Sequence, residues 1–159
     1  DVDWGALDFL VVDLPPGTGD VPLSLQQTIP LHGALLVTTP QAVVRADTAR
    51  AAAMLRELDI PILGCIENMS GVVCPHCHGD VPLFPDATQD RAESFGAPRL
   101  GRIPFDPRIA ASGDGGTPLV AAHADSPAAA VFREIARGLV RNGGASGRTQ
   151  QSVVEQEGL

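Results

Sequence analysis

The sequence DFLVVDLPPGTGD, at residues 8–20, combines a carboxylate with a loop rich in glycine and proline. Residues 9–12 form a short apolar run with two β-branched side chains, which predicts a buried parallel strand ending at Asp13. Ligands bind beyond the carboxyl ends of the strands in an open α/β sheet. There a carboxylate can hold hydrated Mg²⁺, and the backbone of a glycine loop can approach a terminal phosphate. The stretch thus favours a nucleotide site; the alternative is a strand-end aspartate that caps the next turn.

Two further residues with the right chemistry are Cys74 and Cys77, in the sequence CPHC. Two thiolates at this spacing can chelate one metal on a turn. The third cysteine, Cys65, lies in an apolar run, where a free cysteine behaves as a small buried hydrophobic residue. Three cysteines are too few for a disulfide scaffold of this size. Cys74 and Cys77 are therefore the candidate metal ligands.

The elements that position these residues alternate along the chain. Apolar runs predict strands, and periodic segments rich in helix formers predict helices. This alternation predicts an α/β fold, in which helices flank a parallel sheet on both faces. The expected strands are 9–12, 33–39, 60–67 and 100–103, and the expected helices are 20–28, 43–58, 87–95 and 126–140, the last with Ser126 as its N-cap.

Composition limits the class of protein. The chain of 159 residues is long enough for one domain with a real core. We expect that domain to occupy residues 1–141, with an irregular CxxC loop at about 69–85 and a disordered tail at 142–159. The net charge of −8 argues against a nucleic-acid partner. No signal peptide or long apolar run is present, which predicts a cytoplasmic protein without a membrane segment.

The start of the sequence is unusual. It has no initiator methionine, and a strand of the central type follows almost at once. A strand that is buried on both faces needs neighbours, and parallel neighbours need crossover helices. All 11 basic residues are arginines, whereas a phosphate-binding P-loop normally carries a lysine. We therefore expect the N-terminal part of the domain to be absent from this sequence.

Five motifs follow one another in the order and spacing of a known family. They are VVDLPPGTGD (11–20), VTTPQ (37–41), ENMS (67–70), CPHC (74–77) and GRIPFDPRI (101–109). From about residue 7 to residue 140, the chain resembles the Mrp/ApbC family of iron–sulfur cluster carrier ATPases, relatives of the MinD and ParA partition ATPases. The resemblance implies a deviant Walker P-loop NTPase domain, MinD/ParA-like, that works as a homodimer.

The resemblance also implies roles for single residues. Asp13 matches the Walker B acidic residue, which orders Mg²⁺ and the attacking water, and Gly17 matches the switch glycine that faces the γ-phosphate. Asn68 matches the position that hydrogen-bonds the adenine edge of ATP. Pro104 and Asp106 match a turn beside the base. From the residues alone, Asn68 could simply end a strand and Asp106 could cap a helix.

This sequence departs from the family in one respect. The family's phosphate loop, with its two lysines, lies upstream of the matching segment, and neither it nor the first switch is present here. By resemblance the protein is an ATP hydrolase, but this chain keeps only the magnesium and adenine sides of the site. We expect that the chain alone neither binds ATP tightly nor hydrolyses it.

The sequence CPHC is compatible with four kinds of site. A thiol–disulfide oxidoreductase would need a long helix after the first cysteine, which HGDVP cannot start. Covalent haem at C-x-x-C-H would need an exported chain. A structural zinc needs four ligands, whereas only the two cysteines and His76 or His78 are local, with His78 awkwardly placed beside Cys77; a zinc shared between two chains stays open. The family's arrangement is a [4Fe–4S] cluster that bridges two subunits through Cys74 and Cys77 of each.

The mechanism that the resemblance implies couples these two sites. Nucleotide binding at Asp13 would change how the subunits meet, and the cluster would pass to apo iron–sulfur proteins. Two alternatives remain open. One is a MinD/ParA-like partition ATPase with a structural zinc, and the other is a metal-binding module without nucleotide chemistry.

Overall fold

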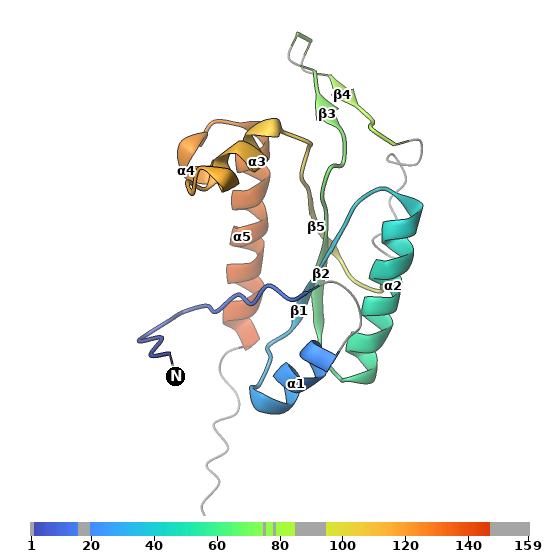
Figure 1. The fold of residues 1–159 in the computed structure, drawn as a ribbon, viewed down its shortest axis with the longest axis vertical. Coiled ribbons are helices and arrows are strands. Elements are labelled where there is room, and N and C mark those ends of the chain that lie inside the picture. Colours follow the sequence, from blue (N-terminus) through green and yellow to red (C-terminus); the bar gives the residue numbers. More distant parts are fainter. Residues whose placement is uncertain (1, 16–19, 75, 78, 85–94, 147–159) are drawn as a thin grey trace, which may run out of the picture.

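The computed structural model describes residues 2–15, 20–74, 76–77, 79–84 and 95–146. Helices lie on both faces of a small parallel sheet, with α2 on one side and α5 on the other (Figure 1). The α/β architecture predicted from the sequence is therefore confirmed. The elements run in chain order as α1 (Asp20–Thr28), β1 (Ala34–Thr38), α2 (Ala42–Glu57), β2 (Ile62–Glu67), β3 (Val72–Val73), β4 (Asp80–Val81), β5 (Arg99–Arg102), α3 (Pro107–Asp114), α4 (Leu119–Ala122) and α5 (Pro127–Ser146).

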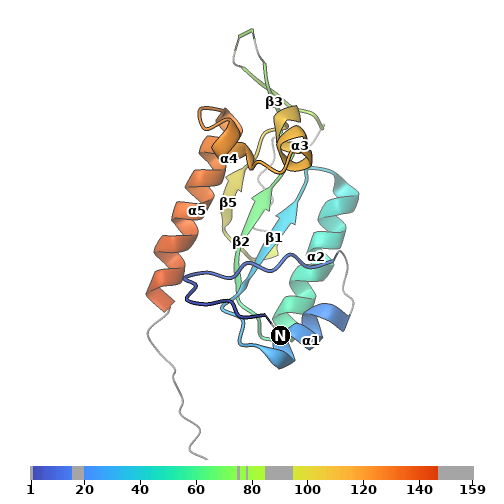
Figure 2. The same ribbon diagram turned by 60° about the vertical axis from the view of Figure 1, so that its left-hand side comes forward.

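The main sheet has the strand order β1-β2-β5, and both neighbouring pairs are parallel. Leu36 lies opposite Cys65, and Ile66 lies opposite Gly101. All three carboxyl ends therefore meet at one edge of the sheet, which is the upper edge in Figure 2. A parallel sheet of this kind collects its ligands at that edge.

Successive residues of β2 serve two separate cores, because side chains alternate between the faces of a strand. Cys65 packs with Leu36, Leu55 and other residues on the α2 side of the sheet. Ile66 packs with Ile103 and Ile135 on the α5 side. Burial of each such aliphatic side chain stabilises the fold by about 1.5–3 kcal/mol. The central strand is thus fixed from both faces.

Helix α5 begins as the sequence predicts. The backbone N–H of Ala129 donates to Ser126 Oγ at 3.1 Å, so Ser126 is the N-cap. The helix continues to Ser146, past the end predicted at Val140, because extension of an existing helix adds a hydrogen bond for each residue. Residues 147–159 of the predicted tail lie outside the described residues.

The predicted strand at residues 9–12 is wrong for this structure. The segment pairs with no strand among the described residues, and Val11 is 85% exposed. It crosses the strands of the sheet instead of running beside them (Figures 1 and 2). An apolar run becomes a buried strand only where neighbouring strands pair with its backbone and other elements cover its faces. In the described structure nothing supplies these partners.

Two predicted features fall outside the described residues, namely the helix at 87–95, except for its last residue, and Gly17. The structure also adds elements that the sequence did not predict. Helices α3 and α4 occupy residues after β5, and a hairpin of β3 and β4 occupies the segment expected to be irregular. None of the described helices is long and apolar enough to cross a membrane.

Candidate functional site

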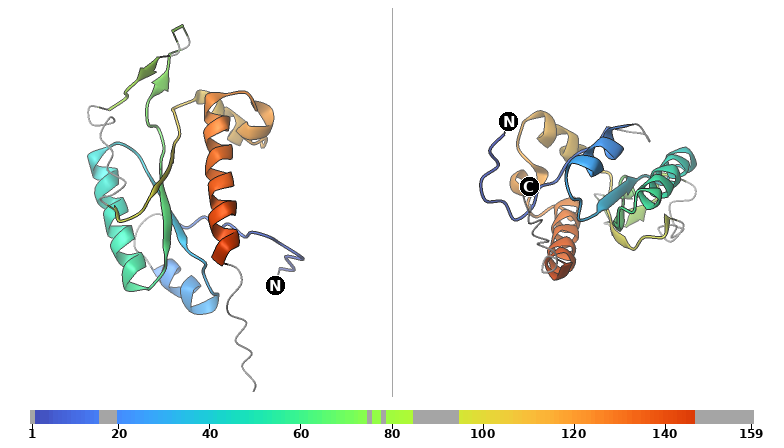
Figure 3. Two further views of the ribbon diagram at one scale, coloured as in Figure 1. Left: turned by 180° about the vertical axis from the view of Figure 1, so that it is seen from behind. Right: turned by 90° about the horizontal axis from the view of Figure 1, so that it is seen from below.

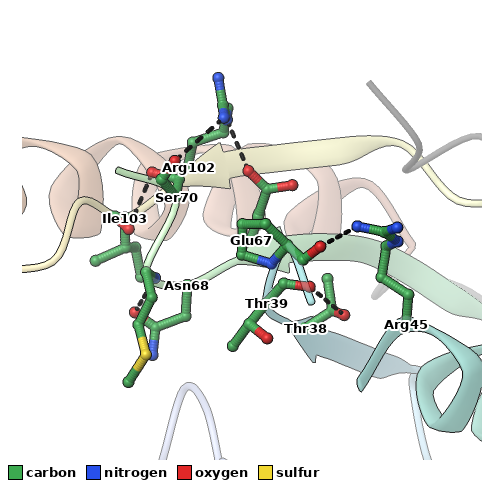
Figure 4. Close-up of polar contacts among 10 residues, drawn as sticks. Thr38, Thr39, Arg45, Glu67, Asn68, Ser70, Arg102 and Ile103 are labelled. Carbon is green, nitrogen blue, oxygen red and sulfur yellow. Dashed lines mark hydrogen bonds and ion pairs between the residues drawn. The ribbon is translucent and has the colours of Figure 1, made fainter. Parts of the chain in front are cut away.

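The carboxyl edge of the sheet brings together the motifs VTTPQ and ENMS. The backbone N–H of Asn68 donates to the carbonyl oxygen of Thr38 at 2.8 Å, which ties the end of β2 to the end of β1. Next to this bond, Thr39 Oγ1 is buried without a hydrogen-bond partner among the described residues. Figure 4 shows these side chains at the ends of the strands. Asn68 therefore lies at the carboxyl edge of the sheet, directly after β2.

Asn68 also shapes the bend that follows β2. Its Oδ1 accepts a hydrogen bond from the backbone N–H of Met69 at 2.9 Å. Met69 has a φ of 53°, a left-handed conformation that costs a residue with a side chain on the order of 1 kcal/mol or more. The surrounding hydrogen bonds hold this bend in place. Adenine recognition by Asn68 stays a prediction.

Past the bend, Ser70 is bonded to the end of β5. Its backbone N–H and its Oγ both donate to the carbonyl oxygen of Ile103, at 3.0 and 3.1 Å. Arg102 donates from Nε to Glu67 Oε1 at 2.8 Å and from Nη2 to the Ser70 carbonyl oxygen at 3.5 Å. The backbone N–H of Phe105 then donates to the Gly71 carbonyl oxygen at 2.7 Å. We call these contacts between residues 67–71 and 102–105 the Ser70 junction; Figure 4 shows those among Glu67, Ser70, Arg102 and Ile103.

Sequence reasoning missed the junction. ENMS and GRIPFDPRI were recognised as motifs, but nothing in the sequence paired their residues. The opposite charges of Glu67 and Arg102, each at the end of a predicted strand, are the available signal. That signal could be used only once β2 and β5 were known to be neighbours.

The turn at Pro104 and Asp106 leads into helix α3. Asp106 Oδ1 accepts from the backbone N–H of Arg108 at 3.0 Å, and its Oδ2 lies 2.6 Å from Arg108 Nη2. Hydrogen bonds from the Arg108 guanidinium are the main reason why the pKa of Asp106 lies below its usual value. The structural alternative considered from the sequence, that Asp106 caps a helix, is confirmed. The contact of Pro104 and Asp106 with a nucleotide base stays a prediction.

Asp13 and the segment around it are placed differently from the prediction. Asp13 is exposed and follows an irregular stretch, so it does not lie at the tip of a strand in this structure. Its partner in the expected nucleotide site, Gly17, falls outside the described residues. The structure therefore brings Asn68 and the 104–106 turn to one edge, whereas Asp13 follows none of the strands in the described part of the chain.

Cys74 and Cys77 lie at the tip of the hairpin formed by β3 and β4. The strands are antiparallel, with Val72 opposite Val81, and the Cys74 N–H extends the ladder by donating to the Gly79 carbonyl oxygen at 2.9 Å. The hairpin projects beyond the carboxyl edge of the main sheet (Figures 1 and 3). Both thiols are free, with Cys74 half-buried and Cys77 exposed.

Cys74 differs from Cys65 in its readiness to ionise. The backbone N–H of Cys77 and then that of His76 lower the pKa of Cys74, since both stabilise its thiolate. Burial raises the pKa of Cys65 to about 11, and the charge of Glu67 adds to this effect. The thiolate is the form that binds metal. Cys65 thus acts as a core residue, as predicted, and only the hairpin presents accessible thiols.

The sulfur donors at the hairpin tip are those of Cys74 and Cys77. Among the residues that the structure describes, no group of three or more His, Cys, Asp and Glu side chains is gathered to hold a metal ion. Soft thiolate ligands suit iron–sulfur clusters and zinc. The residues present therefore fit one half of a four-thiolate site.

Comparison with known proteins identifies the chain's relatives. A family model described as ParA, NUBPL iron-transfer P-loop NTPase, matches residues 1–140. The iron-sulfur cluster carrier protein of Pyrococcus abyssi is 43% identical over 141 residues, which cover 88% of this chain and 48% of that protein. The iron-sulfur cluster carrier protein of Aquifex aeolicus is 47% identical over 135 residues, which cover 84% of this chain and 37% of that protein. The iron-sulfur cluster transfer protein NUBPL of Dictyostelium discoideum is 41% identical over 140 residues, covering 87% and 43%.

Two solved structures have a fold similar to that of this chain. A nucleotide-binding protein from Archaeoglobus fulgidus, in complex with ADP, is 35% identical with a TM-score of 0.59 and covers 71% of this chain and 47% of its own. The septum site-determining protein MinD of Pyrococcus horikoshii, complexed with Mg-ADP, is 26% identical with a TM-score of 0.55, covering 74% and 45%.

The chain spans less than half the length of each of these relatives. The matches nevertheless include the sheet, its carboxyl edge and the cysteine hairpin, since the family model extends over residues 1–140. The chain therefore belongs to the NUBPL iron-transfer P-loop NTPases of the ParA family, whose relatives include iron–sulfur cluster carrier proteins.

Proposed function

We propose that this protein carries a [4Fe–4S] cluster on the cysteine hairpin and delivers it to apo iron–sulfur proteins. The observation that carries the proposal is the exposed hairpin tip with Cys74 and Cys77, the accessible thiols of the described chain. A cargo that must be handed over needs ligands at the surface, and the hairpin projects there. The names of the relatives, which are cluster carrier and transfer proteins, support the same cargo.

The cluster would join two copies of the chain. A [4Fe–4S] cluster takes four thiolates, and one hairpin offers two. Cys74 and Cys77 of each of two subunits complete the set, which makes a homodimer with the cluster at its interface. A ligand shared in this way is sensitive to small rigid-body shifts of the subunits, and this sensitivity provides a route to release.

Nucleotide would control that shift. In the proposed site, Asp13 orders Mg²⁺ and the attacking water, Gly17 faces the γ-phosphate, and Asn68, Pro104 and Asp106 contact the adenine of ATP. Two similar solved structures are complexes with ADP, which supports a nucleotide as a ligand of this fold. ATP binding and hydrolysis belong in this proposal to the whole protein. We expect the present chain to show no turnover alone, and measurable ATP hydrolysis by the pure chain would contradict this.

Anaerobic reconstitution with iron and sulfide tests the cargo. We expect absorbance near about 400 nm and about four iron and four sulfide ions for each dimer. Cys74→Ser combined with Cys77→Ser should abolish the band. Cys65→Ala is the matched control, since it also removes a cysteine, and it should retain the band. The proposal fails if the double variant still builds a cluster.

Zinc analysis of the same samples distinguishes the proposed cluster from the main alternative, a structural zinc. About half an equivalent of zinc for each chain, without the absorbance band, would indicate a structural zinc shared between two hairpins. That result would favour a partition ATPase over a cluster carrier. Transfer is then tested directly, by mixing the loaded protein with an apo iron–sulfur protein and measuring the recipient's activity.

A further inference from the structure

The cysteine hairpin is joined to the rest of the molecule through the Ser70 junction. Its first strand, β3, begins at Val72, directly after Gly71, and the Gly71 carbonyl oxygen accepts from the Phe105 N–H at 2.7 Å. A Cβ atom on Gly71 would lie 2.9 Å from the Val81 carbonyl oxygen, so β4 also packs closely at this point. The orientation of the hairpin is therefore set where residues 70–71 meet residues 103–105.

Ser70 makes three hydrogen bonds to the end of β5 and the residue that follows it. Its N–H and its Oγ donate to Ile103, and its carbonyl oxygen accepts from Arg102. The Glu67 carboxylate, which lies mostly buried, holds Arg102 from the other side at 2.8 Å. Since Met69 before it has a positive φ, these contacts hold the chain in a bend that it would not adopt freely.

The same short segments carry the residues expected to contact a nucleotide base. Asn68 stands two positions before Ser70, and Pro104 directly follows Ile103. A shift of either segment at the carboxyl edge must move Ser70 or stretch its two bonds to Ile103. Because Gly71 follows at once, the shift reaches the hairpin.

We propose that Ser70, supported by the Glu67–Arg102 pair, is a positioning residue that couples the base side of the nucleotide site to the cysteine hairpin. This inference rests on the proposed function, because it assigns the means by which one site senses the other. Coupling between two sites is reciprocal. We therefore expect metal binding at Cys74 and Cys77 to stabilise the junction, an effect that is measurable without nucleotide.

Hydrogen exchange of single amides, followed by NMR on the 159-residue chain, tests the coupling with Co²⁺ as the probe. Cobalt–thiolate absorbance reports metal binding, and the Ser70 and Phe105 amides report the junction. We expect Co²⁺ to slow exchange of both amides about fivefold or more, the lower end of typical couplings. Ser70→Ala should keep the absorbance and lose most of the slowing at Phe105, whereas Ser70→Thr, which keeps a hydroxyl, should restore it.

A matched control removes a similar bond elsewhere. Thr28 Oγ1 donates to the Ser24 carbonyl oxygen at 2.7 Å in α1, away from the hairpin. Thr28→Ala should therefore leave the cobalt effect at Phe105 unchanged. Glu67→Gln provides a second variant that weakens the junction without touching Ser70, and it should reduce the slowing at Phe105 in the same way.

The outcomes distinguish the two proposals. Cobalt–thiolate absorbance without slower amide exchange outside the hairpin would overturn the coupling and leave the cysteine site in place. Equal slowing in Ser70→Ala, Glu67→Gln and the unmodified chain also overturns it, because the junction would not be needed. No cobalt–thiolate absorbance would remove the proposed metal site, and the coupling would fail with it.

Discussion

Arg102 Nε donates to Glu67 Oε1 at 2.8 Å, a contact that joins the carboxyl ends of β5 and β2 across 35 positions of sequence. Glu67 is mostly buried and Arg102 is partly exposed, so solvent screens the pair only in part. The contact lies beside the bend that leads to the cysteine hairpin. It therefore links the stability of the sheet edge to the position of the proposed cluster ligands.

This pair should contribute modestly to stability. We expect Glu67→Gln to lower the free energy of unfolding by about 1 kcal/mol or less, because the glutamine keeps an oxygen acceptor and loses the charge. The Asp47–Arg50 pair, also at 2.8 Å but well exposed, is the control. Asp47→Asn should have a smaller effect. Urea unfolding of the two variants measures both values, and a larger loss from Asp47→Asn would contradict the argument.

Stability should depend on pH through Asp106. Hydrogen bonds from Arg108 lower the pKa of this carboxyl in the folded chain. In acid the unfolded state therefore binds more protons than the folded state, so stability rises with pH through this range. The contribution is complete above the unfolded pKa of about 3.9 and is lost as the pH falls through the lower folded value.

Substitution separates the charge of Asp106 from its capping role. Asp106→Asn should remove this part of the pH dependence but keep an acceptor for the Arg108 N–H. Asp106→Ala should also lose the cap of α3, at a cost of about 0.5–2 kcal/mol. Urea unfolding between acid and neutral pH measures both effects. The assignment is wrong if Asp106→Asn leaves the acid slope unchanged.

The three thiols should react in two classes. Cys65 is only 1% exposed, and burial raises its pKa to about 11, so it should be protected from thiol reagents in the folded chain. Cys74 and Cys77 should react quickly. Titration with a chromogenic disulfide should therefore count two fast thiols, and a third only after unfolding. Three fast thiols in the native chain would show that Cys65 is accessible.

Close packing of α5 on β5 depends on Gly101. A Cβ atom at this position would lie 2.7 Å from Ile135 Cγ1. Gly101→Ala should therefore destabilise the fold by about 1–3 kcal/mol through overpacking. Gly138 in α5 is the matched control, since nothing lies within 4 Å of a Cβ atom there. Gly138→Ala should stabilise the helix by about 0.5–1 kcal/mol, and thermal unfolding compares the two.

Local sequence patterns were sufficient for much of the fold. The apolar runs predicted β1, β2 and β5, and the cap at Ser126 predicted the start of α5, because these signals lie within a few residues of each other. The motifs also identified the family and placed Cys74 and Cys77 outside the core. Each of these features depends on residue type and short spacing.

The remaining features depended on contacts between distant segments. Residues 9–12 have the composition of a strand, but a strand exists only where a neighbouring chain segment pairs with it, and the described structure provides none. The Ser70 junction likewise arises from pairing of residues 33 positions apart, such as Ser70 with Ile103. Composition and periodicity describe one segment at a time. Which segments become neighbours was decided by the tertiary structure, because burial and backbone hydrogen bonding are satisfied by the chain as a whole.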